Sequence, residues 1–238
     1  DILIHDGTSF YTGKGLKQLV VLNNGEKVAT KKLQRLQKYA DGIVVHDEHS
    51  LNELEKALPE MKITCIPFGV SEKENAASLV EQTAYKVKLT GGSDYLLFFA
   101  DAIKQDDLLV FLKAFSLFKK WNRTAMKLVL VVEEKSRRMA ESLIDKYLYK
   151  DQILFANNLE AESNSMLFSS AYAAVFYDAS NASLAKMMNA LRLHVPLLLP
   201  SKPSLESIFI NCATFYSNQP DQLSEKLTLL YKDETRKN

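Results

Sequence analysis

The segment Tyr95–Phe115, with the sequence YLLFFADAIKQDDLLVFLKAF, decides the fold class of this chain. Its first six residues form a continuous apolar run, which is typical of a strand covered on both faces of a parallel sheet. The residues from Asp106 onward have apolar side chains at helical spacing. A buried strand followed by an amphipathic helix is the repeating unit of α/β proteins.

The same alternation of apolar strands and amphipathic helices runs along all 238 residues. We predict strands at residues 1–6, 17–23, 41–47, 62–68, 94–100, 127–133, 152–156, 171–177, 195–200 and 212–216. We predict helices at residues 25–40, 48–59, 106–121, 134–149, 161–171, 183–193 and 219–233. The pattern therefore predicts an α/β fold with Rossmann-like parallel sheets.

A polar stretch over residues 71–94, which ends in Gly91-Gly92, indicates a connection between two domains. We predict a partial N-terminal Rossmann-like domain over residues 1–75, a linker over 76–94 and a C-terminal Rossmann-like domain over 95–238. The second domain has the length and alternation of a complete Rossmann-like unit, whereas the first has only about four strands and two helices.

Charge and apolar composition narrow the class of protein. The chain has 30 basic and 29 acidic residues, which argues against a general nucleic-acid or membrane-surface binder, although the balance can hide a local basic patch. No apolar run approaches the roughly 20 residues of a transmembrane helix. Cys65 and Cys212 lie in apolar surroundings, which favours buried thiols in a reducing compartment over a disulfide. We expect a cytoplasmic protein without a transmembrane segment or a nucleic-acid partner.

Three short motifs suggest ligand binding and also have simpler interpretations. The histidines of HDEHS, residues 46–50, are three apart rather than the four of a helical zinc motif, and the acids between them suit a helix N-terminus. TGKG at 12–15 and TGGS at 90–93 are too short for phosphate loops and suit turns. We therefore expect no metal and no cofactor.

Two longer stretches carry a family resemblance. The first is residues 39–72, with the sequence YADGIVVHDEHSLNELEKALPEMKITCIPFGVSE, in which Pro67, Gly69 and Val70 stand at the positions of a Pro-x-Gly-Val hinge. The second is Tyr95–Phe115, which has the pattern of a strand, a loop and a helix. The order of segments from Tyr39 to Asp233 resembles that of the retaining glycosyltransferases with the GT-B fold, specifically those of group 1, also called family 4-like.

The resemblance implies a two-domain enzyme and a reaction. The C-terminal domain would bind a nucleotide-sugar donor, and the N-terminal one, here lacking about two strands of a full domain, would bind the acceptor. The reaction would transfer a hexose to a saccharide or lipid acceptor with retention and without a metal. The lack of those strands leads us to expect either a piece of a longer protein or a reduced domain.

The loop after the first donor-domain strand departs from the family pattern. There the family has a Gly-Arg pair and, five residues beyond, a lysine that together bind the donor diphosphate. The corresponding positions here are Ala100, Asp101 and Asp106, with Lys104 nearby. An acid about 4 Å from a phosphate charge repels it by roughly 1 kcal/mol in water and about 4 kcal/mol at an effective dielectric constant near 20.

The two donor-binding glutamates of the family are also absent. They lie eight residues apart around a glycine-rich turn, and the corresponding positions are Asn181 and Asn189, with Ala182 and Leu184 in place of glycines. Asn157 replaces another usual glycine. The resemblance assigns no catalytic residue, and the residues that it places at the donor site are Asp101, Lys104, Asp106, Asn157, Asp178, Asn181, Ser183 and Asn189.

The turn DASN at residues 178–181 has both a functional and a structural interpretation. Ser180 or Asn181 suits the cap of a helix whose buried stripe would be Leu184, Met187, Met188 and Leu191. Three hypotheses remain open for the function of the whole chain. The first is a glycosyltransferase with altered donor chemistry, and the second is a non-catalytic binding or scaffolding subunit that docks a protein partner or a saccharide. The third, which the hinge and the order of segments favour least, is another doubly wound protein that binds a nucleotide or other ligand.

Overall fold

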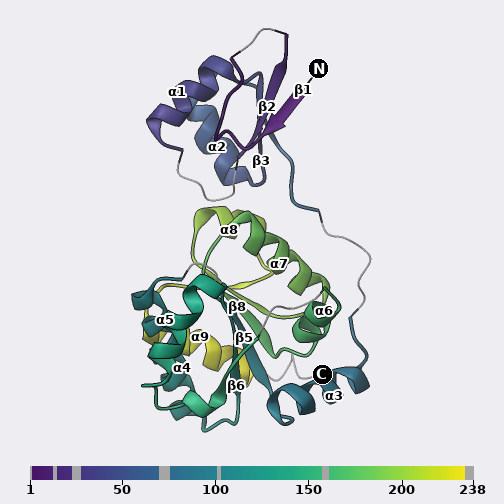
Figure 1. Cartoon of the computed structure of the whole chain (residues 1–238), viewed down its shortest axis with the longest axis vertical. Coiled ribbons are helices and arrows are strands. Elements are labelled where there is room, and N and C mark those ends of the chain that lie inside the picture. The colour runs from purple at the N-terminus through teal and green to yellow at the C-terminus, as the bar shows by residue number, and fades with distance from the viewer. Residues whose placement is uncertain are drawn as a thin grey trace. The chain divides into compact units, whose positions relative to one another are not determined.

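The computed structural model describes residues 2–12, 15–22, 28–69, 76–100, 103–156 and 161–233. The chain divides into two compact units, which are Asp1–Gly69 with Ala179–Ala185 and Lys202–Ile210, and Val70–Asp178 with Lys186–Ser201 and Asn211–Asn238 (Figure 1). Among the described residues each unit contains one parallel sheet.

The first sheet has four parallel strands in the order in which they follow along the chain. They are β1 (Ile2–His5), β2 (Lys17–Val21), β3 (Gly42–Val45) and β4 (Ile63–Cys65), and the helices are α1 (Thr30–Tyr39) and α2 (Glu48–Ala57). Leu36 of α1 and Leu54 of α2 pack with Val20, Ile43 and Val45 of the strands into one apolar core. Both helices are therefore held by apolar side chains on their sheet-facing sides.

The second sheet has six parallel strands in the order β10-β9-β8-β5-β6-β7. These strands are β5 (Tyr95–Phe99), β6 (Lys127–Val131), β7 (Ile153–Phe155), β8 (Ala173–Phe176), β9 (Leu197–Pro200) and β10 (Thr214–Tyr216). The chain runs outward from β5 to β7 and then returns to β8 on the other side of β5. This reversal makes the carboxyl ends of β5 and β8 the place where doubly wound sheets bind ligands.

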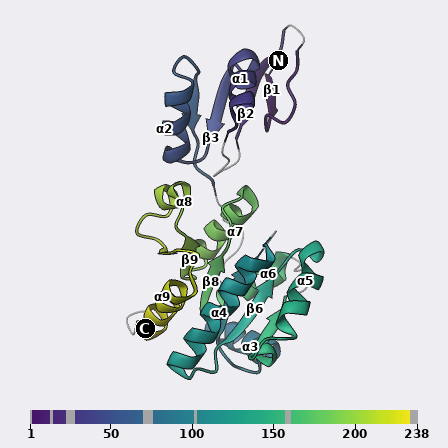
Figure 2. The same ribbon diagram turned by 90° about the vertical axis from the view of Figure 1, so that its left-hand side faces the viewer.

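Helices cover both faces of the second sheet. On one face lie α4 (Gln105–Asn122), α5 (Glu134–Ile144) and α9 (Pro220–Lys232), and on the other lie α6 (Ala161–Ser169) and α7 (Asn181–Arg192) (Figures 1 and 2). The remaining helices are α3 (Leu79–Thr90), which contacts α6, the short α8 (Pro203–Ile208) and a 3-10 turn at Lys150–Gln152. The central strands are consequently shielded from water on both sides.

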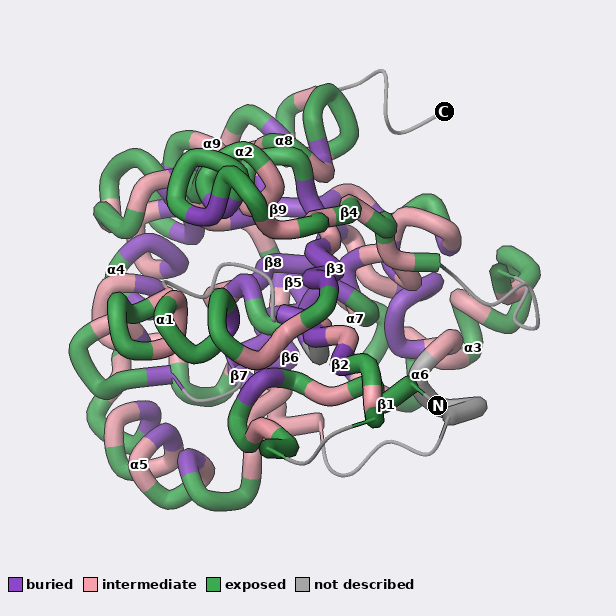
Figure 3. Tube along the Cα trace, turned by 90° about the horizontal axis from the view of Figure 1, so that it is seen from above, coloured by how far each residue is buried: buried purple, intermediate pink, exposed green. Residues whose placement is uncertain are grey.

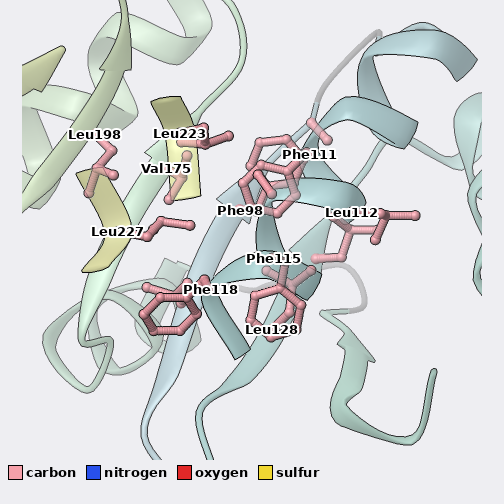
Figure 4. Packing of buried hydrophobic residues seen from close by; sticks show 14 of the residues in the cluster. Phe98, Phe111, Leu112, Phe115, Phe118, Leu128, Val175, Leu198, Leu223 and Leu227 are labelled. Atoms are coloured by element: carbon pink, nitrogen blue, oxygen red, sulfur yellow. The ribbon is translucent and has the colours of Figure 1, made fainter. Parts of the chain in front are cut away.

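The core beneath α4 is aromatic. The rings of Phe98 and Phe111 stack with their centroids 3.6 Å apart, and Phe115 and Phe118 continue the row along α4 toward α9 (Figure 4). Every residue of β5 and β8 is buried, as the purple trace in Figure 3 shows. The continuous apolar run that predicted a doubly covered strand at Tyr95 is thus confirmed.

The ten predicted strands and seven predicted helices are all found, but their ends differ by up to five residues: α5, predicted to reach Tyr149, ends at Ile144, and α1, predicted from residue 25, begins at Thr30. Residues 23 and 25–27 lie outside the described ones. Two helices, α3 and α8, were not predicted. Helix α3 occupies most of the segment that we assigned to a linker. It begins at a Ser78–Glu81 capping box and ends at Gly91, whose φ of +68° favours glycine, so TGGS is a helix end.

The cysteine prediction is only partly correct. Both thiols are free, but Cys65 is half-buried and Cys212 is exposed, so the expectation of two buried thiols is wrong for Cys212. Cys212 lies in a turn before β10, where the neighbouring apolar residues in the sequence do not cover it. Among the helices of the described ranges, none is long and apolar enough to span a membrane.

Candidate functional site

The candidate site lies where β5 and β8 end side by side. The amide of Tyr177, directly after β8, donates to the carbonyl of Phe99 at the end of β5 over 3.2 Å. The amide of Ala100 is bonded to the carbonyl of Val131 at the end of β6 over 2.9 Å. The two loops that the sequence indicated as donor-binding therefore leave the sheet at neighbouring points of its carboxyl edge.

The loop after β5 places an acid where the resemblance implies a lysine. Ile103, the last residue of this loop before the helix cap, is buried. Lys104 is the exposed N-cap of α4, and Asp106 is exposed in the first turn of that helix. Asp101, which stands at the arginine position, lies outside the described residues. At this loop the structure thus presents Lys104 and Asp106 together at the surface.

A hydrogen-bonded cluster that the sequence did not reveal joins three elements at this edge. Asp107 in the first turn of α4 accepts a hydrogen bond from Tyr177 Oη over 2.5 Å and one from Asn218 Nδ2 over 2.7 Å. The three residues lie up to 111 positions apart in the chain. No local sequence pattern links Asp107 to these two partners.

The cluster changes the acidity of Tyr177. Burial, followed by the hydrogen bond to Asp107 and the negative charges of Asp107 and Asp178, raises the pKa of Tyr177 to about 12. Tyr177 is consequently a neutral hydrogen-bond donor at neutral pH, and Asp107 receives two donors. This arrangement ties the β10–α9 connection to α4 and β8.

The turn after β8 is a helix cap. Ser180 Oγ accepts a hydrogen bond from the amide of Ser183 over 3.3 Å, so the prediction of a capping residue at this turn is confirmed for Ser180. Ser183 is fully buried and its hydroxyl lies 3.3 Å from Ser180 Oγ, so it supports the turn rather than an exposed surface. Asp178 is half-buried beside the cap.

Helix α7 runs without interruption from Asn181 to Arg192. Eight helical steps separate positions 181 and 189 by about 12 Å along the axis. The family pattern implies a glycine-rich turn between these positions, but Ala182 and Leu184 stand there and both favour helix. Asn189 accepts a 2.8 Å hydrogen bond from Arg192 Nη2 on the same helix.

The buried stripe of α7 has a neighbouring cation. Leu184 and Met187 are fully buried as predicted, whereas Met188 and Leu191 are only half-buried. The ammonium of Lys186 lies 5.2 Å from the centroid of the Phe99 ring, which stacks on Phe168 and Phe176. Lys186 is thus a cation close to the end of β5, and its position in a helical pattern gave no sign of this.

The remaining sequence candidates contribute little to the site. Asn157 lies outside the described residues. In HDEHS, Asp47 caps α2 through a 2.8 Å bond from the Ser50 amide, and His46 Nδ1 lies 2.9 Å from the Ile66 carbonyl. The described ranges contain no group of three or more His, Cys, Asp or Glu side chains that could hold a metal ion.

Solved structures share this fold. The Anabaena protein HepE in complex with UDP and glucose matches with a TM-score of 0.73 and 9% identity over 93% of this chain and 63% of its own. Sucrose-phosphate synthase from Thermosynechococcus elongatus gives 0.69 and 15% over 92% of this chain and 59% of its own. S. aureus TarM with UDP, fondaparinux and alpha-GlcNAc-glycerol gives 0.68 and 12% over 94% of this chain and 45% of its own.

The chain therefore spans about half to two thirds of the length of these GT-B glycosyltransferases. No curated protein sequence matches it. The sequence profile of the family "Glycosyl transferases group 1" matches residues 80–238, which include all of the second sheet and the two loops at its switch point. The GT-B fold and this match together show that the chain belongs to the glycosyl transferases group 1 family.

Proposed function

We propose that this chain binds a nucleotide-diphosphate sugar at the carboxyl edge of the second sheet, between the loops that follow β5 and β8. The observation that carries the proposal is the strand order, which reverses at β5 and β8 within the region that matches the family. HepE and TarM, which share the fold, are both seen with UDP. Lys104 and Lys186 are the described cations that we assign to the diphosphate.

The reaction proposed is transfer of the hexose to a hydroxyl of a saccharide or lipid acceptor with retention. The bond between the anomeric carbon and the diphosphate breaks, and a bond from that carbon to the acceptor oxygen forms on the same face of the sugar. The acceptor hydroxyl gives its proton to a phosphate oxygen of the nucleoside diphosphate, which leaves with the bonding electron pair. Preorganised cations near the leaving diphosphate would stabilise its growing charge.

The departures at this edge predict a slow reaction. Asp106 opposes a diphosphate where a lysine would attract it, and α7 is a continuous helix where the resemblance implies a glycine-rich turn. Losing one such electrostatic contact in an enzyme costs about 100- to 1,000-fold in rate. We therefore propose a turnover far below that of family members with the full set of cations and carboxylates.

We also propose that the protein works in a reducing compartment such as the cytoplasm. The free thiols of Cys65 and Cys212 support this location.

Calorimetric titration with UDP-, GDP- and ADP-linked hexoses tests the donor site directly. We expect heat with one base, competition by the corresponding nucleoside diphosphate, and no competition by the free nucleoside at equal concentration. Proton NMR of the product formed with a saccharide acceptor then reports whether the anomeric configuration is retained. Absence of binding to every nucleotide sugar by the full-length protein would reject the donor proposal.

The second candidate is a non-catalytic subunit that binds a saccharide or a protein partner. The Asp107–Tyr177–Asn218 cluster favours it, because carboxylate, phenol and amide groups suit neutral hydroxyl ligands better than diphosphate. Titration with neutral oligosaccharides separates the two candidates. Saccharide binding without any nucleotide-sugar binding would support the subunit, and hydrolysis or transfer of a nucleotide sugar would support the enzyme.

A further inference from the structure

Helix α1 has a uniformly cationic outer face. Its sequence TKKLQRLQKY contains four basic residues and no acidic one. Lys31, Arg35 and Lys38 follow one another at i, i+4 and i+7, so they lie on one side of the helix, and all three are exposed. Leu36 points to the opposite side and is fully buried in the core of the first sheet. The near-neutral net charge of the chain hides this face, since α2 carries three glutamates.

Two of these cations rest on aromatic rings. The guanidinium of Arg35 lies 4.7 Å from the Phe10 centroid, and the ammonium of Lys38 lies 5.1 Å from that of Tyr39. Phe10 in turn contacts Tyr39, with their centroids 5.9 Å apart. The rings restrict the two long side chains before any ligand binds. Binding of a surface to these cations therefore costs less side-chain conformational entropy than binding to unrestrained side chains.

Exposed apolar side chains border the cationic face. The side-chain amide of Gln18 donates to the carbonyls of both Tyr11 and Tyr39, over 2.8 and 3.0 Å, and so holds Tyr11 beside the end of α1. Tyr11 is 44% exposed, and Leu3, the register partner of Gln18 in β1, is 37% exposed. We call Lys31, Arg35, Lys38, Tyr11 and Leu3 the basic face.

We propose that the basic face docks on an anionic lipid membrane. Lysine and arginine near an anionic lipid surface are each attracted to it, and tyrosine favours the boundary between water and lipid. Nucleic-acid binders commonly neutralise 6–10 phosphates, whereas this face offers three exposed cations on a single helix. A membrane surface presents anionic groups at any spacing, so three cations and two bordering apolar groups suit it better.

Co-sedimentation of the full-length protein with vesicles of phosphatidylcholine and phosphatidylglycerol in equal amounts tests the proposal. We expect binding that weakens as salt is added and is absent on pure phosphatidylcholine vesicles. The variant Lys31→Gln/Arg35→Gln/Lys38→Gln should bind the mixed vesicles about 100-fold more weakly, from about five-fold per cation. Glutamine is a good helix former, so α1 should remain folded, and circular dichroism checks this.

A matched variant removes the same charge elsewhere. Lys56→Gln/Lys113→Gln/Lys120→Gln changes three exposed lysines on α2 and α4 and should bind the mixed vesicles within about two-fold of the unaltered protein. Equal weakening by both variants would show a general charge effect and overturn the proposal. Tighter binding to single-stranded DNA than to the mixed vesicles at equal salt would overturn it in favour of a nucleic acid. Titration of the same variants with nucleotide sugars tests the donor site separately, and its outcome does not depend on whether the basic face binds vesicles.

Discussion

The interior of the second sheet and its carboxyl edge follow the family to different degrees. In the interior, all residues of β5 and β8 are buried, and aromatic side chains from β5 and α4 stack closely. At the edge, a few residues beyond, Asp106 and helix α7 stand where the resemblance implies a lysine and a glycine-rich turn. Packing constrains the interior because every volume change there costs stability, whereas exposed edge positions can change with little effect on the fold.

The interior should respond most strongly to truncation. Phe98→Ala removes a fully buried ring that stacks on Phe111, and we expect it to lower the free energy of unfolding by about 3–5 kcal/mol. Trp121→Ala on the outer side of α4, where the ring is 51% exposed, should cost roughly 1 kcal/mol or less. Urea denaturation of both variants measures the contrast. Equal costs would contradict the view that the interior carries the fold.

A buried hydroxyl should have an intermediate effect. Tyr216 is buried in β10, and its Oη donates to the Phe176 carbonyl over 2.7 Å. Tyr216→Phe should lower the free energy of unfolding by about 1–2 kcal/mol, because the carbonyl loses its donor inside the protein. Tyr11→Phe, at an exposed side chain, is the control and should leave the urea midpoint unchanged.

At the edge, a single exchange should alter binding without altering stability. Asp106→Lys restores the cation of the family pattern at an exposed position, and removal of the repulsion should tighten UDP binding by about ten-fold. Asp151→Lys makes the same charge change at an exposed position before β7 and is the matched control. Calorimetry that finds the same gain in both variants would show a non-specific charge effect.

The smallest effect concerns pH. Tyr177 has a pKa of about 12 in the folded protein and near 10 when unfolded, so the stability that it contributes is present below pH 10 and is lost as pH rises toward 12. Because Tyr177 is partly exposed, we expect a loss of only about 1 kcal/mol after solvent screening. Denaturation of wild type and Tyr177→Phe on both sides of pH 10 should show a steeper decline for wild type. Parallel declines would assign the pH dependence to other tyrosines.

Local patterns were sufficient to predict most of the fold. Short apolar runs indicated the ten strands, and the two runs at β5 and β8 are buried at every residue, as expected of strands that are covered on both faces. Helix α3 was missed although Ser78 and Glu81 form a capping box, since Leu79, Val80 and Val87 are exposed and give no buried stripe. Helix α8 has only six residues, too few for a helical period to appear.

The sequence by itself determined the strands, the parallel α/β class, the family resemblance and the two loops to inspect, because each depends on residues that are close in the chain. Only the tertiary structure decided that Asp107, Tyr177 and Asn218 meet and that Lys186 lies over Phe99. It likewise decided that Arg35 and Tyr11 border one face of the first sheet. Such contacts join residues far apart in the chain, and their geometry depends on the strand order rather than on any local spacing.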